Sequence, residues 1–369
     1  MPHQDIWRTE NRPVNIHMTT SDTVSRVGAF TSFAGDLREV IVGDMVGADY
    51  FSELPAGQTK ELITRIVTET KEDLDGLAST YQKHGVRVHR PRLIHTRPGL
   101  AEACGTQVIN PMPNFMPHDH VFCMDNTFVN TFFHVDRYHD RESIAHVVDL
   151  LDPTVRYVET PIPVLWDNEY YDALYQPDWR QAPGDRDTII HGPAFYPCGK
   201  HIFHTGSPCI NPNGLAQMQE LFPDHSFVEL LPPFGNHLDA QIRIVKPGLV
   251  LSFIEPEVLR EQVPAMRNWE IMHDDVWHKM KQQIYRTPRP LESWVDDDTT
   301  NSSVSLGLVN IRPDLVAIPR ESTLLCKTLE GANIDWVVCP QRHSHFWNFS
   351  ISCATAIIHR EDHLEDYLS

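Results

Sequence analysis

The runs LGLVN at residues 306–310, LVAI at 315–318 and DWVV at 335–338 decide the fold of this chain. Each run is short and mostly apolar, which predicts a strand. Residues 321–330, between the second and third runs, predict a helix. The segment therefore reads as one unit in the order strand, strand, helix, strand.

The same order of elements recurs upstream. Strands and helices alternate over residues 37–43, 59–84, 86–89, 120–124, 127–130, 143–151, 201–204, 215–222 and 227–230. Sequence identity between the copies is weak, so the repeat is inferred from element order. Residues 175–193 and 264–298 fall outside this order, and we expect them to form excursions or lids between the units.

Composition excludes several classes of protein. The 369 residues carry a formal net charge of −19 and no run of Lys or Arg, which argues against nucleic acid as a partner. No signal-peptide pattern and no apolar run of membrane-spanning length are found, so we expect a cytoplasmic protein without a membrane partner. The seven cysteines include no C-x-x-C pair and are expected to be reduced thiols.

One of these cysteines, Cys353, lies sixteen residues from the C-terminus. A lone cysteine and a distant histidine, here His237, can be brought together by the fold to make a thiolate nucleophile. The alternative readings are a buried structural thiol and a hydrogen-bonded core histidine. Asp239, two residues after His237, is predicted to lie on the same face of a strand and to share its pocket.

Histidine-rich segments allow a metal reading. Asp119 lies between two histidines, and His191 and the pair His343 and His345 could add imidazole ligands to a zinc or iron site. However, 21 histidines produce such pairs by chance, and no ligands have the helical His-Glu-x-x-His spacing. We therefore expect neither a metal nor a cofactor.

Four motifs in order resemble the arginine-dependent amidinotransferases, which include the glycine and inosamine-phosphate enzymes. They are DLREVIVG at 36–43, MPHD at 116–119, HLDA at 237–240 with PGLVL at 247–251, and the C-terminal stretch from Cys353-Ala354-Thr355 to LEDYL at 364–368. The resemblance covers residues 28–369, which we expect to form a single domain after an irregular segment, 1–27. It implies the pentein fold, a pseudo-fivefold α/β propeller of ββαβ units, in agreement with the repeated element order.

The resemblance also implies a reaction. Cys353 would attack the guanidinium carbon of arginine or another guanidine, and the amidino group would pass to an amine of a small-molecule, natural-product pathway. His237 matches the family's acid/base, and Asp119 and Asp239 match the carboxylates that hold the planar guanidinium. A nearby imidazole can lower the pKa of the thiol by ion pairing. The family is often dimeric, so the resemblance allows a homodimer, but the sequence leaves the oligomeric state open.

Further substrate contacts are expected from Asn236, next to the catalytic histidine, and from Asn301 and Ser302. The last two occupy the region where the family binds substrate through hydroxyl groups. Both the guanidine donor and the amine acceptor are therefore expected as partners, although the sequence does not name either molecule.

The chain departs from the family pattern near its catalytic histidine. His191 stands where the family has the aspartate that orients this histidine, unless an alignment gap brings in Asp185 or Asp187. Loss of such a carboxylate costs on the order of 10⁴-fold in a triad. The family's donor-binding arginine also has no clear match, since Arg260 lies too far along.

These departures leave three functions open. The first is amidino transfer, with His191 as a substitute that orients His237. The second is a divergent pentein that uses Cys353 for acyl transfer, amide formation or hydrolysis. The third is a catalytically silent binding protein, in which Cys353 would be unreactive.

Overall fold

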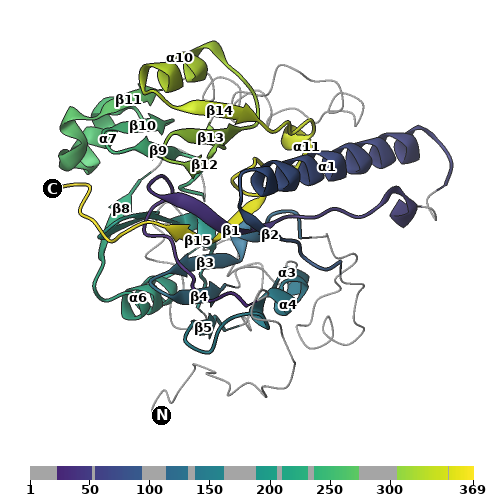
Figure 1. Ribbon diagram of the computed structural model, residues 1–369, viewed down its shortest axis with the longest axis horizontal. Coiled ribbons are helices and arrows are strands. Elements are labelled where there is room, and N and C mark those ends of the chain that lie inside the picture. Colours follow the sequence, from purple (N-terminus) through teal and green to yellow (C-terminus); the bar gives the residue numbers. More distant parts are fainter. Residues whose placement is uncertain are drawn as a thin grey trace.

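The computed structural model describes residues 23–51, 55–93, 114–131, 138–161, 188–205, 210–231, 237–273, 306–347 and 349–369. Within them the strands form five separate three-stranded sheets arranged in a ring (Figure 1). In every sheet one strand pair is antiparallel and the next is parallel. The strand–strand–helix–strand repeat predicted from element order is confirmed.

The five units are built alike. Unit one contains β15 (Thr355–Glu361), β1 (Asp36–Val42), α1 (Gln58–Lys83) and β2 (Arg87–His89). Unit two contains β3 (Val121–Met124), β4 (Thr127–Asn130), α3 (Tyr138–Ser143), α4 (Ala145–Val148) and β5 (Arg156–Glu159). Unit three contains β6 (Phe195–Cys198), β7 (His201–Thr205), α6 (Pro212–Leu221) and β8 (Ser226–Leu230). Unit four contains β9 (Ile242–Lys246), β10 (Leu249–Ser252), α7 (Pro256–Gln262) and β11 (Glu270–His273). Unit five contains β12 (Val309–Arg312), β13 (Leu315–Ile318), α10 (Thr323–Gly331) and β14 (Asp335–Val338).

Short elements connect these strands and helices, either within a unit or between units. Within a unit they are the 3₁₀ helices η1 (Ala48–Phe51) and η6 (Pro264–Asn268), and between units they are the 3₁₀ helices η2 (Pro117–Asp119) and η5 (Gly192–Ala194) and the helix α11 (Ser344–Trp347). Of these, η2 carries Asp119, and η5 begins directly after His191, its N-cap residue.

The repeat follows from local chemistry. Two antiparallel strands need only a tight turn, and between β3 and β4 this turn is Asp125-Asn126, with φ of 49° and 54°. Aspartate and asparagine tolerate this left-handed region better than most residues. A parallel third strand needs a crossover, which the helix of each unit provides.

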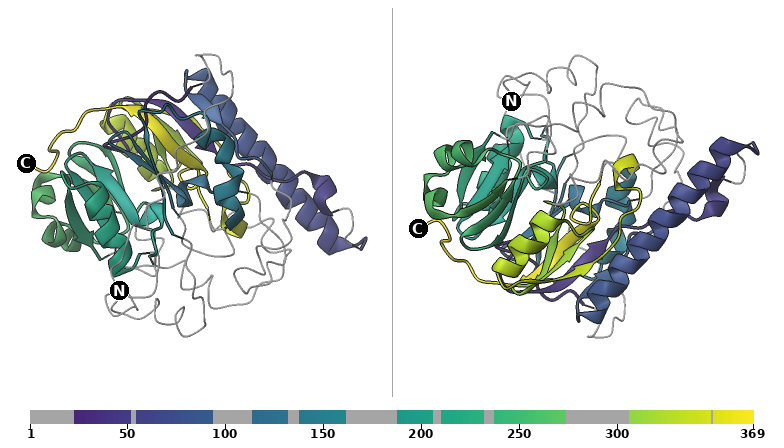
Figure 2. Two further views of the ribbon diagram at one scale, coloured as in Figure 1. Left: turned by 90° about the horizontal axis from the view of Figure 1, so that it is seen from below. Right: turned by 90° about the horizontal axis from the view of Figure 1, so that it is seen from above.

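Unit one joins the two ends of the chain. Its central strand β1 pairs with β15 over Asp36 to Val42, opposite Glu361 to Thr355, and with β2 on the other side. The 26-residue helix α1 packs Leu74, Leu77 and Tyr81 into the core, while its N-terminal end projects from the ring (Figures 1 and 2).

The structure corrects three predicted elements. The helix expected at 143–151 is two short helices, α3 and α4, interrupted at Ile144. The predicted lid at 264–298 begins instead as part of unit four, because η6 and β11 complete that unit and β11 pairs with β10. The strand expected at 306–310 begins later, at Val309, as β12.

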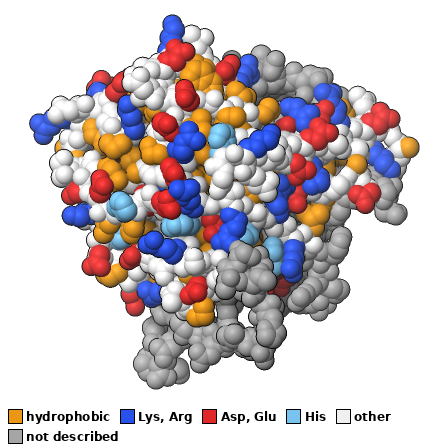
Figure 3. All heavy atoms as spheres, viewed as in Figure 1, with side chains coloured by type: hydrophobic (Ala, Val, Ile, Leu, Met, Phe, Trp, Pro, Cys, Tyr) orange, Lys and Arg blue, Asp and Glu red, His pale blue; other side chains and the backbone are white. Residues whose placement is uncertain are grey.

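Surface charge is mixed on the face seen in Figure 3, where acidic and basic side chains alternate over the sheets and along α1. Among the described helices, none combines the length and the apolar character needed to cross a bilayer.

Candidate active site

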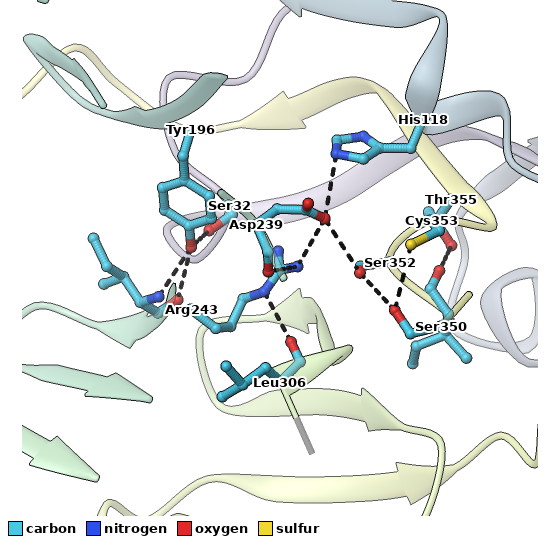
Figure 4. A network of polar contacts seen from close by, with 12 residues as sticks. Ser32, His118, Tyr196, Asp239, Arg243, Leu306, Ser350, Ser352, Cys353 and Thr355 are labelled. Carbon is cyan, nitrogen blue, oxygen red and sulfur yellow. Dashed lines mark hydrogen bonds and ion pairs between the residues drawn. The ribbon is translucent and has the colours of Figure 1, made fainter. Parts of the chain in front are cut away.

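The carboxylate of Asp239 is the centre of a buried polar network. Its Oδ2 accepts hydrogen bonds from Arg243 Nη2 and Ser352 Oγ, each at 3.4 Å, and lies 3.5 Å from His118 Nε2 (Figure 4). Arg243, itself buried, also donates to the carbonyl of Leu306. We call Asp239, His118, Arg243 and Ser352 the Asp239 network.

The thiol of Cys353 is connected to this network through hydroxyl groups. Ser350 Oγ lies 3.7 Å from Cys353 Sγ and 2.8 Å from Ser352 Oγ, which in turn donates to Asp239 (Figure 4). Cys353 is 7% exposed. Its carbonyl accepts the backbone N–H of His118 at 3.3 Å. The loop of Cys353 is therefore tied directly to the 3₁₀ helix η2, which carries Asp119.

A second group contains Asp119, His191 and His237, which we call the aspartate–histidine cluster. His191 Nε2 lies 3.7 Å from Asp119 Oδ1, and the rings of His191 and His237 meet edge to face with centroids 4.7 Å apart. Each residue offers one ligand-type atom, and the three atoms all lie within 4.8 Å of one another.

Gly192 explains how His191 reaches Asp119. A Cβ at Gly192 would lie 2.4 Å from the backbone carbonyl oxygen of His118, so only glycine permits the close approach of η5 to η2. The next segment is held as well, because Leu238 N–H donates to the carbonyl of Pro193 at 2.9 Å. These contacts place the segments of His191, His237 and Asp119 side by side.

The structure brings together most of the residues that the sequence singles out. Asp119, His191 and His237 meet in one cluster, and Asp239 is linked to Cys353 by two serines. The remaining three candidates, Asn236, Asn301 and Ser302, lie outside the described residues.

The prediction that His237 and Asp239 share a strand face is wrong. The N–H groups of Gln241 and Ile242 both donate to the carbonyl of Leu238, which turns the chain before β9 begins at Ile242. A turn separates side chains that a strand would align. His237 therefore contacts His191, while Asp239 faces Arg243 and Ser352.

Sequence reasoning missed four residues of the site. His118 is adjacent to Asp119, and Ser350 and Ser352 precede Cys353 by three and one positions, so proximity in sequence was a usable signal. Arg243 gave none, because an arginine between two isoleucines in a strand reads as a surface position.

Electrostatics in the site differ from the expectation for Cys353. Burial, reinforced by the negative charges of Asp239 and Asp119, raises the pKa of the Cys353 thiol to about 12. The predicted ion pairing with an imidazole would have lowered it. The thiol is therefore protonated at neutral pH, because the low-dielectric, anionic surroundings disfavour a thiolate.

Two histidines near the carboxylates, His191 and His118, are neutral at neutral pH. Burial lowers the pKa of His191 to about 3, against the opposing influence of Asp119. Burial also lowers the pKa of His118 below its usual range, although Asp239 and Asp119 act in the other direction. With these imidazoles neutral, two carboxylates and one guanidinium, that of Arg243, leave a single negative charge to be compensated.

The chain is similar in sequence to amidinotransferases. No sequence model of a protein family matches the chain. Inosamine-phosphate amidinotransferase 1 of Streptomyces glaucescens is 26% identical over 365 residues, covering 90% of this chain and 96% of that protein.

Solved structures show the same fold. The inosamine-phosphate amidinotransferase of Streptomyces griseus superposes with a TM-score of 0.66 at 22% identity, covering 93% of this chain and 99% of that one. An amidinotransferase of the saxitoxin biosynthetic pathway from Microseira wollei gives 0.67 at 18% identity, covering 92% and 99%. The predicted pentein fold is confirmed.

Proposed function

We propose that this chain, a homologue of the inosamine-phosphate amidinotransferases, moves an amidino group from a guanidine donor such as arginine to the amine of a small-molecule biosynthetic intermediate. The observation that carries the proposal is the position of Cys353, whose thiol is buried within the influence of two carboxylates and linked to one of them by hydroxyl groups.

The donor site requires a flat cation. Asp239 uses Oδ2 for its three partners, while its buried Oδ1 makes no hydrogen bond within the described part of the chain. A guanidinium group can donate to this oxygen and to Asp119, and its charge would balance the remaining negative charge. The fixed carboxylates would hold the plane of the guanidinium with its carbon toward sulfur.

Donor binding would also activate the nucleophile. The same two carboxylates that raise the pKa of the Cys353 thiol are the ones that the donor neutralises. A bound cation beside the sulfur favours the thiolate, so we infer that Cys353 loses its proton only when the guanidine is in place. This order would protect the free enzyme from unproductive reactions of the thiol.

The amidino group then moves in two steps, first from the donor to Cys353 and next from Cys353 to the acceptor amine. His237 takes the thiol proton, sulfur bonds to the guanidinium carbon, and the carbon–nitrogen bond of the donor breaks as His237 returns the proton to the departing amine. Cys353 now carries the amidino cation. The acceptor amine attacks the same carbon, the carbon–sulfur bond breaks, and the amine proton passes through His237 back to sulfur.

His191 acts as a positioning residue in this proposal. Its ring packs edge to face on His237 and its Nε2 faces Asp119, so it can fix the ring plane of His237. A neutral imidazole supplies no charge to stabilise a protonated His237, unlike the carboxylate expected from the family resemblance. His191→Asp should therefore raise kcat and shift its pH profile if His191 is only a substitute.

Mass spectrometry of the protein and of its Cys353 peptide tests the proposal. After mixing with arginine and no acceptor, the wild type should gain the mass of one amidino group on the Cys353 peptide, with release of ornithine. Cys353→Ala should gain nothing, and Cys198→Ala, which removes a buried thiol elsewhere, should behave as wild type. An unmodified wild-type protein with a panel of guanidines would contradict amidino transfer, and steady formation of urea or citrulline would indicate hydrolysis instead.

A further inference from the structure

We propose that the aspartate–histidine cluster, Asp119, His191 and His237, is also a binding site for one divalent transition-metal ion of the zinc type when no guanidine donor is bound. The ligand set is two imidazoles and one carboxylate, a combination that binds zinc in proteins and leaves a coordination position open.

Distances in the cluster are close to those required. The three ligand atoms lie within 4.8 Å of one another, and His191 Nε2 and Asp119 Oδ1 are 3.7 Å apart. Two ligands of one tetrahedral zinc ion lie about 3.3 Å apart, since each bond is about 2.0–2.2 Å long. Side-chain rotations that bring the most distant pair of ligand atoms closer by up to about 1.5 Å would close the difference.

Backbone contacts hold the three ligands in place before any ion binds. The carbonyl of Asp119 accepts the hydroxyl of Thr131 at 3.1 Å, Gly192 packs against the carbonyl of His118, and Leu238 N–H donates to Pro193. Each ligand-bearing segment is thus fixed to its neighbour. Preorganisation of this kind lowers the cost of assembling a metal site.

The cluster differs from two other histidine–carboxylate contacts among the described residues. His120 with Asp140 at 2.7 Å and His343 with Glu69 at 2.6 Å are direct pairs at hydrogen-bonding distance. Among the described residues, only the aspartate–histidine cluster gathers three ligand-type side chains around one point. Three ligand-type side chains around one point can coordinate an ion, whereas a two-residue pair supplies too few ligands.

Metal binding would switch the enzyme off. The ion would occupy Asp119 and His237, to which the proposed function assigns donor binding and proton transfer. The metal and the guanidine would therefore exclude each other, and this consequence alone rests on the proposed function.

Calorimetry with zinc sulfate tests the site directly. The full chain, stripped of metal with a chelator, should bind one Zn²⁺ per molecule without any substrate present. His191→Asn should weaken this binding by on the order of 100-fold, as expected for removal of an ordered metal ligand. His225→Asn is the matched control, because His225 is also buried but packs against Phe30 and Phe222, away from the cluster, and its zinc affinity should be that of wild type.

Two further results separate the alternatives. Zinc binding that is lost in Cys353→Ser and retained in His191→Asn would overturn the proposal and identify a thiolate site. Arginine should weaken zinc binding in the wild type. Stoichiometric zinc binding that arginine does not affect would overturn mutual exclusion, and because zinc is titrated alone first, it would locate the failure in the donor assignment.

Discussion

The Asp239 network and the aspartate–histidine cluster both contain a buried carboxylate beside imidazole, yet they are built differently. In the first, Asp239 accepts hydrogen bonds from the guanidinium of Arg243 and a hydroxyl, so its charge is compensated within the fold. In the second, Asp119 faces the imidazole of His191, which burial keeps neutral. From this difference we expect Asp239 to anchor the fold through Arg243 as well as to bind the proposed donor, and Asp119 to act mainly in donor binding.

Asp119→Asn should impair donor binding and catalysis, and we expect it to have the largest effect of the variants proposed here. Removing one partner of a buried charge pair costs about 2–5 kcal/mol, which predicts a fall in kcat/KM of roughly 30- to 5,000-fold. Initial rates with arginine as donor measure it. The midpoint of urea unfolding should move little, and a decrease in kcat/KM below tenfold would remove Asp119 from the donor site.

Asp239→Asn should lower the stability of the fold. Arg243 would remain buried without its carboxylate, and an uncompensated buried charge costs about 3 kcal/mol of unfolding free energy. Urea denaturation measures the loss. The double variant Asp239→Asn with Arg243→Met should recover part of it, because no charge is then left unpaired. Equal stability of wild type and Asp239→Asn would show that the pair contributes nothing.

The rate at which iodoacetamide alkylates Cys353 should show the smallest effect, and it reports how Asp239 acts on the thiol. Alkylation requires the thiolate, and the pKa of about 12 means that the rate should rise with pH through pH 7–11 without a plateau. Burial is the largest cause of this shift, and the charge of Asp239 is second. Asp239→Asn should therefore lower the pKa and speed alkylation on the order of tenfold at pH 8, about one pKa unit. A plateau near pH 8 in the wild type would contradict the raised pKa.

Much of the fold was predictable because each unit is encoded locally. Strands such as Thr127–Asn130 and Leu315–Ile318 are apolar runs bounded by polar turns, and the amphipathic helix α1 matches its prediction within a residue at each end. The pairing of β1 with β15 was not readable from local pattern, because it joins segments separated by more than 300 residues. Closure of the ring was predicted only from the resemblance to the amidinotransferase family.

The site was predictable in its residues but not in its connections. Cys353, His191 and Asp119 stand out as chemical types at informative positions. The turn that separates His237 from Asp239 depends on backbone hydrogen bonds to the carbonyl of Leu238. The residue pattern did not predict these bonds. The raised pKa of Cys353 depends on burial and on carboxylates from distant segments, and such electrostatics exist only after folding.

Pairing of β1 with the last strand has a consequence for biosynthesis of the protein. Cys353 stands two residues before β15, and β15 ends eight residues before the C-terminus. While the ribosome is still translating, the middle units can fold, but the first sheet must wait with one edge uncovered. The proposed nucleophile therefore reaches its place in the fold only after β15 has been synthesised, and a chain that lacked β15 would have neither the first sheet complete nor the ring closed.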